Sequence, residues 1–224
     1  MEALSHKSTI ILLASLHLDE DTAPAFIAEY REILRELAPS VVCAELSPEQ
    51  LTGVATCRSK PEYEAAVLPV ARELGAQIVP IQMPTEKALA WQHRMQAVHA
   101  QLRTTREGRF YLTYCEVLEK AQLEGMLRIA RGHGGMEYFQ LREYDWLQVA
   151  PTYEAMSRLL PELFALHVEW NQYFLDKIEE ALGRFPDRRF VVTVGGYHRY
   201  WLWDRLSARA DVSLHNLQSY RAMR

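Results

Sequence analysis

Residues 190–198 read Phe-Val-Val-Thr-Val-Gly-Gly-Tyr-His, an apolar, largely β-branched run that ends in two glycines and a histidine. A short apolar run of this kind predicts a strand that is buried on both faces. The Gly195-Gly196 pair permits a sharp turn and the close approach of a ligand to the backbone. The segment therefore predicts a strand that delivers His198 to the start of a helix, a connection typical of α/β proteins.

Two more runs have the same form. Residues 9–16 are apolar and lead into His17, and residues 41–44 are apolar and lead into Glu45. Helical spacing between these two runs predicts a β-α-β unit, which favours parallel strands. The carboxyl ends of parallel strands share one edge of a sheet, and in open α/β sheets that edge holds the ligand. We therefore expect His17, Glu45 and His198 to converge from distant parts of the chain.

The remaining pattern completes an α/β domain. Residues 76–81 and 212–217 read as further strands, and Gln82 follows the first of them at the same edge. Residues 85–184 are almost wholly helical, with long segments over 85–106, 110–131 and 152–182 and a break at Gly108. This is too much helix for a simple crossover. We expect one domain over residues 1–224, with a central, mostly parallel sheet of about five strands, helices on both sides and a helical insertion at residues 85–184 that shapes a pocket.

Composition excludes several classes of protein. A net charge of −4 argues against a nucleic-acid binder, because neutralising phosphates needs a concentrated basic surface. No stretch approaches the ~20 apolar residues of a membrane span, and the amino terminus does not read as a signal peptide. The expectation is a cytoplasmic protein that acts on a small-molecule or peptide substrate, without membrane or nucleic-acid partners; a homodimer is compatible with it.

Each residue of the trio has a chemical reason to be functional. The positive end of a helix dipole disfavours an imidazolium at the position of His198, and a neutral imidazole is what a metal ligand or general base requires. Glu45 comes directly after an apolar strand, so it needs a partner: a metal, an arginine or a histidine. Packing or capping histidines and a surface acid remain the alternatives. Tyr197 is expected in the pocket wall.

The motifs Ala14-Ser15-Leu16-His17, Ala44-Glu45-Leu46 and Gly195-Gly196-Tyr197-His198 occur in this order along the chain. They resemble the GxxH, Val-Glu-Leu-type and second GxxH motifs of the TraB/TIKI superfamily, which includes erythromycin-esterase-like and ChaN-like proteins. Glu169-Trp170-Asn171 is similar to the Glu-Arg-Asn helix motif of many members. The chain departs from the family pattern at Ala14, which replaces the first glycine, and at three positions where relatives often carry two arginines and an aspartate: Gln50, Trp170 and Gln82.

The resemblance implies a pocket lined by these residues, and four functions follow as hypotheses. The first is a metal-assisted hydrolase of peptide or ester bonds, in which His17, Glu45 and His198 hold a divalent metal ion. The second is a metal-free hydrolase with a histidine as general base and Glu45 orienting it. The third is a haem- or ligand-binding protein with a histidine or Tyr197 as axial ligand. The fourth is a non-catalytic, partner-binding member.

The substrate contacts follow from the same resemblance and from the expected sheet edge. Asn171 and Glu169 are expected to orient water or substrate. The other expected substrate-binding residues lie at the strand ends: Gln82, Gly195, Gly196 and Tyr197.

Overall fold

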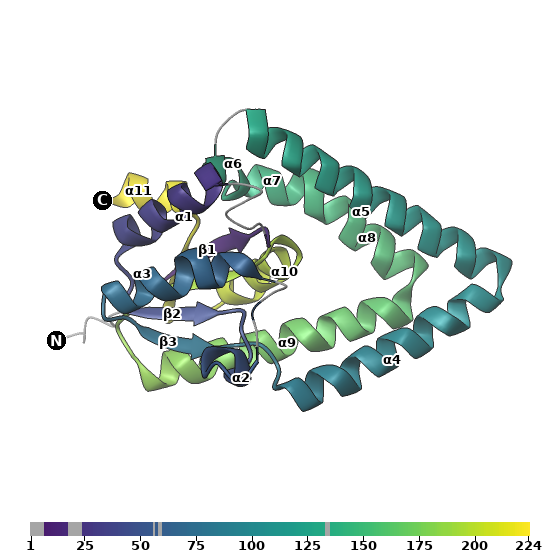
Figure 1. Cartoon of the computed structure of the whole chain (residues 1–224), viewed down its shortest axis with the longest axis horizontal. Helices are drawn as coiled ribbons and strands as arrows, with labels where there is room; N and C mark the ends of the chain where they lie inside the picture. Colours follow the sequence, from purple (N-terminus) through teal and green to yellow (C-terminus); the bar gives the residue numbers. More distant parts are fainter. Residues whose placement is uncertain (1–6, 18–23, 56, 58–59, 133–134) are drawn as a thin grey trace.

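The computed structural model describes residues 7–17, 24–55, 57, 60–132 and 135–224. Within them, five strands form one all-parallel sheet in the order β3-β2-β4-β1-β5 (Figure 1). The predicted α/β class is confirmed. The strands are β1 (Ser8–Ser15), β2 (Val41–Ala44), β3 (Gln77–Pro80), β4 (Arg189–Gly195) and β5 (Val212–His215).

The strand order places the predicted residues at one edge. β4 lies between β1 and β2, with Ser15 paired to Gly195 and Ala44 paired to Thr193. His17, Glu45 and His198 each follow one of these three strands by at most three residues. Because the strands are parallel, all three side chains start from the carboxyl edge of the central strands.

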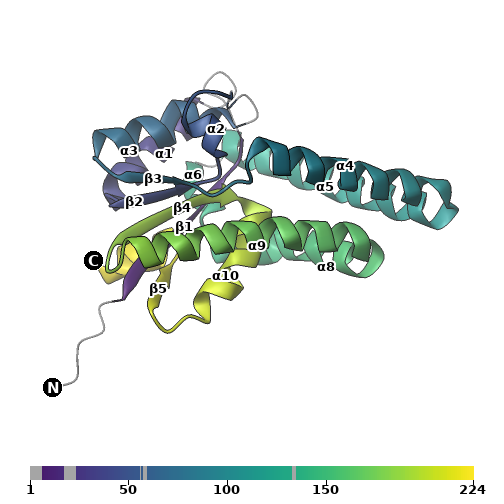
Figure 2. The same cartoon turned by 90° about the horizontal axis from the view of Figure 1, so that it is seen from below.

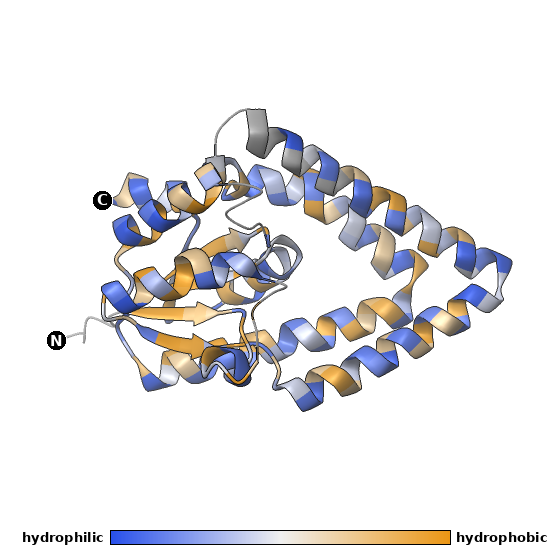
Figure 3. Cartoon of the chain, viewed as in Figure 1, coloured by the Kyte–Doolittle hydropathy of each residue, from blue (hydrophilic) through white to orange (hydrophobic). Residues whose placement is uncertain are grey.

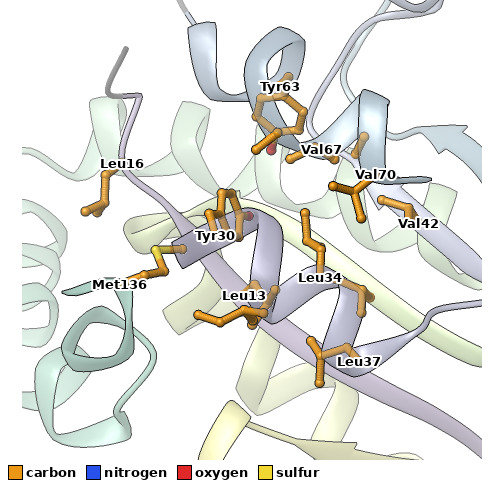
Figure 4. Close-up of a cluster of buried hydrophobic side chains, with 14 of the residues drawn as sticks. Leu13, Leu16, Tyr30, Leu34, Leu37, Val42, Tyr63, Val67, Val70 and Met136 are labelled. Atoms are coloured by element: carbon orange, nitrogen blue, oxygen red, sulfur yellow. The ribbon is translucent and has the colours of Figure 1, made fainter. Parts of the chain in front are cut away.

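Helices cover both faces of the sheet, because alternate strand residues point to opposite sides. Ile11, Leu13 and Val42 belong to a core formed with α1 (Pro24–Leu37), α3 (Leu68–Glu73), α6 (Gly135–Phe139) and α11 (Leu217–Met223). Figure 4 shows part of this core, with Tyr30 and Tyr63 among aliphatic side chains. Ile10, Leu12 and Val192 face α9 (Pro161–Arg184) and α10 (Gly196–Ser207).

Most of the described residues between Thr85 and Arg184, in the region between β3 and β4, are helical, as predicted. The region contains α4 (Thr85–Thr104), α5 (Arg106–Gly132), α6, α7 (Arg142–Tyr144), α8 (Ala150–Leu159) and α9. Figures 1 and 2 show α4 with α5 and α8 with α9 as two helix pairs that project from the sheet in separate layers. The insertion therefore has a base on the sheet and an extended outer part.

Two expected helix boundaries in this insertion are wrong. The break expected at Gly108 lies at Thr105, because the hydroxyl of Thr105 accepts the Gly108 N–H at 2.9 Å and so caps α5. The helix expected over residues 152–182 ends at Leu159 and resumes at Pro161. Proline lacks an N–H and is suited to the first helical turn, so it begins the new helix.

Prolines also explain two wide helical turns. The π-helical turns η1 (Tyr63–Val67) and η2 (Asp145–Val149) each run directly into a helix with proline at its second position, Pro69 and Pro151. A proline inside a helix removes a donor and clashes with the carbonyl four residues before it, which widens the turn. The carbonyl of Ala65, four residues before Pro69, instead accepts the Arg31 Nε–H at 2.8 Å.

Two short elements complete the description. Helix α2 (Pro48–Leu51) begins with a capping box, in which Ser47 and Gln50 satisfy each other's backbone N–H groups. Figure 3 shows polar residues distributed along every helix of the insertion. None of the helices within the described residues is long and apolar enough to cross a bilayer.

Candidate functional site

The three predicted side chains surround the backbone of Gly195. A Cβ atom placed on Gly195 would lie 3.5 Å from Cδ2 of His198 and 3.7 Å from both Oε2 of Glu45 and Nε2 of His17. The structure thus brings together groups that are 28 and 153 residues apart in the sequence. Glycine at position 195 leaves the space between the two imidazoles and the carboxylate open.

His17 is held in position by a buried carboxylate, Glu62. Oε1 of Glu62 lies 2.9 Å from Nδ1 and 3.3 Å from the backbone N of His17, and it also accepts the Ser15 hydroxyl. These contacts hold His17 at a φ of 54°, a left-handed conformation that is rare for a residue with a side chain. Backbone strain of this kind is concentrated at functional sites, where the surroundings enforce it.

The imidazole of His17 is oriented as in a carboxylate–histidine pair. Because Nδ1 donates to Glu62, Nε2 carries the lone pair and points toward Gly195. The side chain of His17 is 38% exposed, whereas that of Glu62 is fully buried. Desolvation lowers the pKa of His17, but the hydrogen bond that Nδ1 donates to Glu62 and the charge of Glu45 outweigh it and raise the pKa above 6.5.

Glu45 is buried and paired, so it is not a surface acid. Its residue is 3% exposed. Oε1 accepts from the Lys60 ammonium at 2.7 Å, and Oε2 accepts from the Gly195 N–H at 2.7 Å. The ammonium also donates to the Glu45 carbonyl at 2.8 Å and to Oε1 of Gln82. The expected partner, a metal, an arginine or a histidine, is therefore a lysine together with a backbone amide.

The Lys60 pair keeps Glu45 ionised. Burial alone raises the pKa of a carboxyl group. Here the positive charges of Lys60, His198 and His17 outweigh the desolvation and lower the pKa of Glu45 to about 2. A fixed negative charge thus lies beside both histidines.

His198 is oriented by a different kind of partner. Its Nδ1 lies 2.5 Å from the amide oxygen of Asn171, and the amide nitrogen of Asn171 donates to the Tyr153 hydroxyl at 2.9 Å. An amide oxygen only accepts, so Nδ1 carries the proton and Nε2 the lone pair. Nε2 lies 3.8 Å from Oε1 of Glu45, beyond hydrogen-bond distance.

Burial lowers the pKa of His198, whereas the pKa of His17 is raised. Its ring packs against Phe174, with 4.8 Å between the ring centroids. Desolvation lowers the pKa of His198 to about 4, although Glu45 partly opposes this shift. The imidazole is therefore neutral at neutral pH, as its place at the start of α10 predicts.

Ser15 is not placed as a nucleophile. Its hydroxyl lies 3.3 Å from Nδ1 of His17, the nitrogen that Glu62 already holds, and the residue is 2% exposed. A serine nucleophile needs contact with the free nitrogen of its histidine. Ser15 instead helps to fix the carboxylate of Glu62.

The other expected substrate contacts are divided between the site and the surface. Asn171 binds His198, and Gln82 binds Lys60. Glu169 lies elsewhere: it is exposed on α9 and forms an ion pair with Arg94.

Tyr197 is half-buried and packs against the cores on both faces of the sheet, and burial raises its pKa to about 12. Gly196 is the first residue of α10, and a Cβ atom placed on it would lie 3.7 Å from Cε1 of Tyr144.

Three residues that organise the site carry no sequence signal of their own. Glu62 and Lys60 flank Pro61 before a helix, where polar residues are ordinary, and Tyr153 lies within α8. Their partners are 45, 15 and 18 residues away. The expectation that Glu45 needs a partner named a metal, an arginine or a histidine, and not the lysine that the structure places there.

The placement of the trio does not fit a divalent ion as it stands. Among the residues that the structure describes, no group of three or more His, Cys, Asp or Glu side chains is placed to hold a metal. Both carboxylate oxygens of Glu45 already accept from N–H groups, one of them a cation. Binding of a divalent metal by His17, Glu45 and His198 therefore stays a prediction.

Comparison with known proteins adds no assignment. The chain matches no protein-family model, no curated protein and no solved structure. The resemblance to the TraB/TIKI superfamily rests on the sequence motifs alone, so the functional argument depends on the geometry of the site.

Proposed function

We propose that this protein is a hydrolase of ester or peptide bonds that uses His17 as a general base and needs no metal ion. The observation that carries the proposal is the His17–Glu62 pair. A fully buried carboxylate holds Nδ1 at 2.9 Å, while the ring is 38% exposed and directs Nε2 at the centre of the site. A base with one nitrogen fixed and the other accessible is the arrangement that general-base catalysis requires.

In the proposed reaction Nε2 of His17 takes a proton from water, and the water oxygen attacks the carbonyl carbon. The imidazolium that forms lies near the charges of Glu62 and Glu45, both of which raise the pKa of His17. As the bond from this carbon to the leaving oxygen or nitrogen breaks, Nε2 returns the proton to the leaving alcohol or amine. This step yields the carboxylic acid and restores the neutral base. Direct attack by water agrees with the position of Ser15 on the far nitrogen.

His198 has a second, different role in this proposal. Its pKa of about 4 keeps it neutral, and Asn171 fixes the tautomer that leaves Nε2 as an acceptor. A neutral acceptor beside the ionised Glu45 is suited to orient the attacking water or a substrate N–H. We assign His198 to positioning and His17 to proton transfer. The motifs at both histidines are also the basis for proposing kinship with the TraB/TIKI superfamily.

The test is hydrolysis by the purified chain of a panel of p-nitrophenyl esters and chromogenic peptides, before and after chelation, with metal content measured by mass spectrometry. We expect turnover of at least one member that chelators leave unchanged and that His17→Ala lowers by about 10³-fold. The exposed His93 on α4 supplies the matched control, His93→Ala, which should retain full turnover.

Three results would overturn the proposal. Activity that chelation abolishes and one divalent metal restores would favour the metal-assisted hydrolase. No turnover of any panel member, with a Soret band on adding hemin that His198→Ala removes, would favour the haem-binding protein instead. Turnover that His17→Ala leaves unchanged would contradict the assignment of the base.

A further inference from the structure

The side-chain amide of Gln140 binds the backbone of β1 near the end of the strand. Its Oε1 accepts from the Ala14 N–H at 2.7 Å, and its amide nitrogen donates to the Ala14 carbonyl at 3.2 Å. Gln140 directly follows α6, lies 126 residues from Ala14 and is fully buried. A side chain from the helical insertion thus binds a residue of the sheet through both of its backbone groups.

Gln140 takes the place of a strand neighbour that β5 does not supply. β5 pairs with β1 only from Ser8 to Ile11, whereas β4 pairs with β1 as far as Ser15. Among the described residues, no strand lies beside Ala14 on the β5 side of the sheet. Ala14 is fully buried, so its N–H and C=O need partners. The two hydrogen bonds with Gln140 satisfy both groups.

The same oxygen of Gln140 also binds the residue that follows His198. Nη1 of Arg199 donates to Oε1 of Gln140 at 3.1 Å, and Nη2 donates to the Leu141 carbonyl at 3.3 Å. Nε and Nη2 of Arg199 donate to Oδ1 of Asp145 at 3.2 and 2.6 Å. Arg199 is only 1% exposed. Its planar guanidinium therefore fixes the first turn of α10 to several buried acceptors at once.

The ion pair at Asp145 does not depend on Gln140. Oδ2 of Asp145 accepts from Arg142 at 2.8 Å, so each carboxylate oxygen already has an arginine. The Arg142 guanidinium also lies 4.3 Å from the centroid of the Trp203 ring on α10. The hydrogen bond from Arg199 to Gln140 is therefore not needed to neutralise the buried carboxylate. What this bond adds is a connection between α10 and β1.

We infer that Gln140 is a positioning residue that sets the place of His17 relative to His198; the inference rests on the proposed hydrolase. Ala14 precedes His17 by three residues, and Arg199 follows His198 directly. One oxygen atom of Gln140 binds both neighbours. A misplacement of about 1 Å at a catalytic site can cost about 10²-fold in rate. A buried connection this close to both histidines resists such a shift.

The experiment is the replacement Gln140→Met. Methionine has nearly the length of glutamine but lacks the amide, so both Ala14 and Arg199 lose their partner. We expect kcat on the best substrate of the panel to fall by about tenfold, with KM little changed. The control is Val212→Ala, at a buried valine where β5 pairs with the amino end of β1. It should lower stability but leave kcat unchanged at temperatures where circular dichroism shows a folded chain.

A second measurement reports the position of His17 without turnover. Burial and the charge of Lys60 lower the pKa of His17, but the hydrogen bond to Glu62 and the charge of Glu45 outweigh them and raise it. A displaced end of β1 weakens the contact with Glu62, so the pKa should fall. NMR titration should show this decrease in the methionine variant and not in the alanine control.

This measurement separates the inference from the proposed reaction. A lower pKa of His17 in Gln140→Met would support the positioning role even if the chain hydrolysed no member of the panel. An unchanged pKa together with unchanged kcat would overturn the inference. Equal losses of kcat in Gln140→Met and Val212→Ala would also overturn it, because the loss would then follow stability alone.

Arg199→Lys tests the connection to α10, and it is the milder variant should Gln140→Met not fold. Lysine keeps a cation beside Asp145 but lacks the fork that also reaches Gln140. We expect a severalfold loss of kcat. The double variant Gln140→Met/Arg199→Lys should lose no more than the more affected single variant, because both changes break the same connection. Losses that multiply in the double variant would overturn the connection through Gln140.

Discussion

The ends of β1 and β4 carry the same side chain at the same edge of the sheet but give it opposite properties. At the end of β1, a buried carboxylate binds His17 and raises its pKa above 6.5. At the end of β4, an amide and a phenyl ring enclose His198, and burial lowers its pKa to about 4. The difference lies in the partner on Nδ1: Glu62 stabilises the imidazolium, whereas Asn171 fixes the orientation without adding charge.

This contrast separates the roles of the two residues. Environments that push the proton affinities of two groups apart are how acid–base assignments are recognised in active sites. Glu45 lies between them, ionised through Lys60, and interacts with both imidazoles. The sheet edge therefore offers one histidine that gains a proton readily and one that remains an acceptor.

The largest expected effect comes from removing one histidine at a time. His17→Ala should lower kcat by about 10³-fold, because general-base catalysis contributes that order of magnitude. His198→Ala should lower it by only about tenfold, because the neutral ring orients but does not take the proton. Steady-state kinetics on the best substrate of the panel measures both. Equal losses in the two variants would contradict the division of roles.

Removing the cation that pairs with Glu45 should destabilise the fold. Lys60→Met leaves the buried Glu45 carboxylate without its cation, a change that costs about 3 kcal/mol in the free energy of unfolding. Urea denaturation at pH 7 measures the loss. The control is Lys87→Met, at an exposed lysine on α4, which should change stability little. Equal stabilities of the two variants would show that Lys60 does not hold Glu45.

Glu62→Gln makes the partner of His17 resemble that of His198. The amide keeps a hydrogen bond but removes the charge, so the pKa of His17 should fall. We expect about a 10²-fold loss of kcat and a shift of the acid limb of the kcat/KM profile to lower pH. Glu64→Gln, at an exposed glutamate on the same turn, is the control. An acid limb that does not move would mean that Glu62 has only a packing role.

The smallest effect is on the pH dependence of stability, where the two histidines should act in opposite directions. The unfolded chain binds a proton at position 198 near pH 6.5, but the folded chain only near pH 4. The stability that neutral His198 contributes is therefore lost as pH falls from about 6.5 toward about 4. Relative to His198→Gln, the wild type should lose on the order of 2 kcal/mol across this window.

For His17 the sign is reversed. Its folded pKa is raised, so its contribution is complete below pH 6.5 and is lost as pH rises through the folded value. Compared with His17→Gln, the wild type should gain stability as pH falls to about 6.5. Denaturation curves for both variants across this range check the two signs, and slopes of the same sign would contradict the contrast.

The residues at the sheet edge could be predicted from the sequence because local patterns mark the strands that precede them. The apolar runs before His17, Glu45 and His198 mark the strands, and parallel strands leave few ways to arrange their ends. The start and end of the helical insertion were also predictable, since Pro84 and Phe185 bound a continuous helical pattern. Thr105 was missed as a helix cap because Gly108 gave a stronger break signal.

The partners that set the two proton affinities could not be predicted. Glu62 reaches His17 across 45 residues, and nothing in the spacing around Pro61 marks it. Glu169 illustrates the reverse case: it shares a motif with Asn171, but two helical positions place them on different faces of α9, and Glu169 binds Arg94 at the surface. Proton affinity depends on long-range burial and charge, which a sequence pattern does not contain.

The most direct test of the contrast is an NMR titration of the imidazole resonances of the full chain, with His17 and His198 assigned from the spectra of His17→Gln and His198→Gln. The account predicts that His17 titrates above pH 6.5 and that His198 remains neutral down to about pH 4. Two histidines that titrate together near 6.5, or His198 titrating above His17, would contradict it.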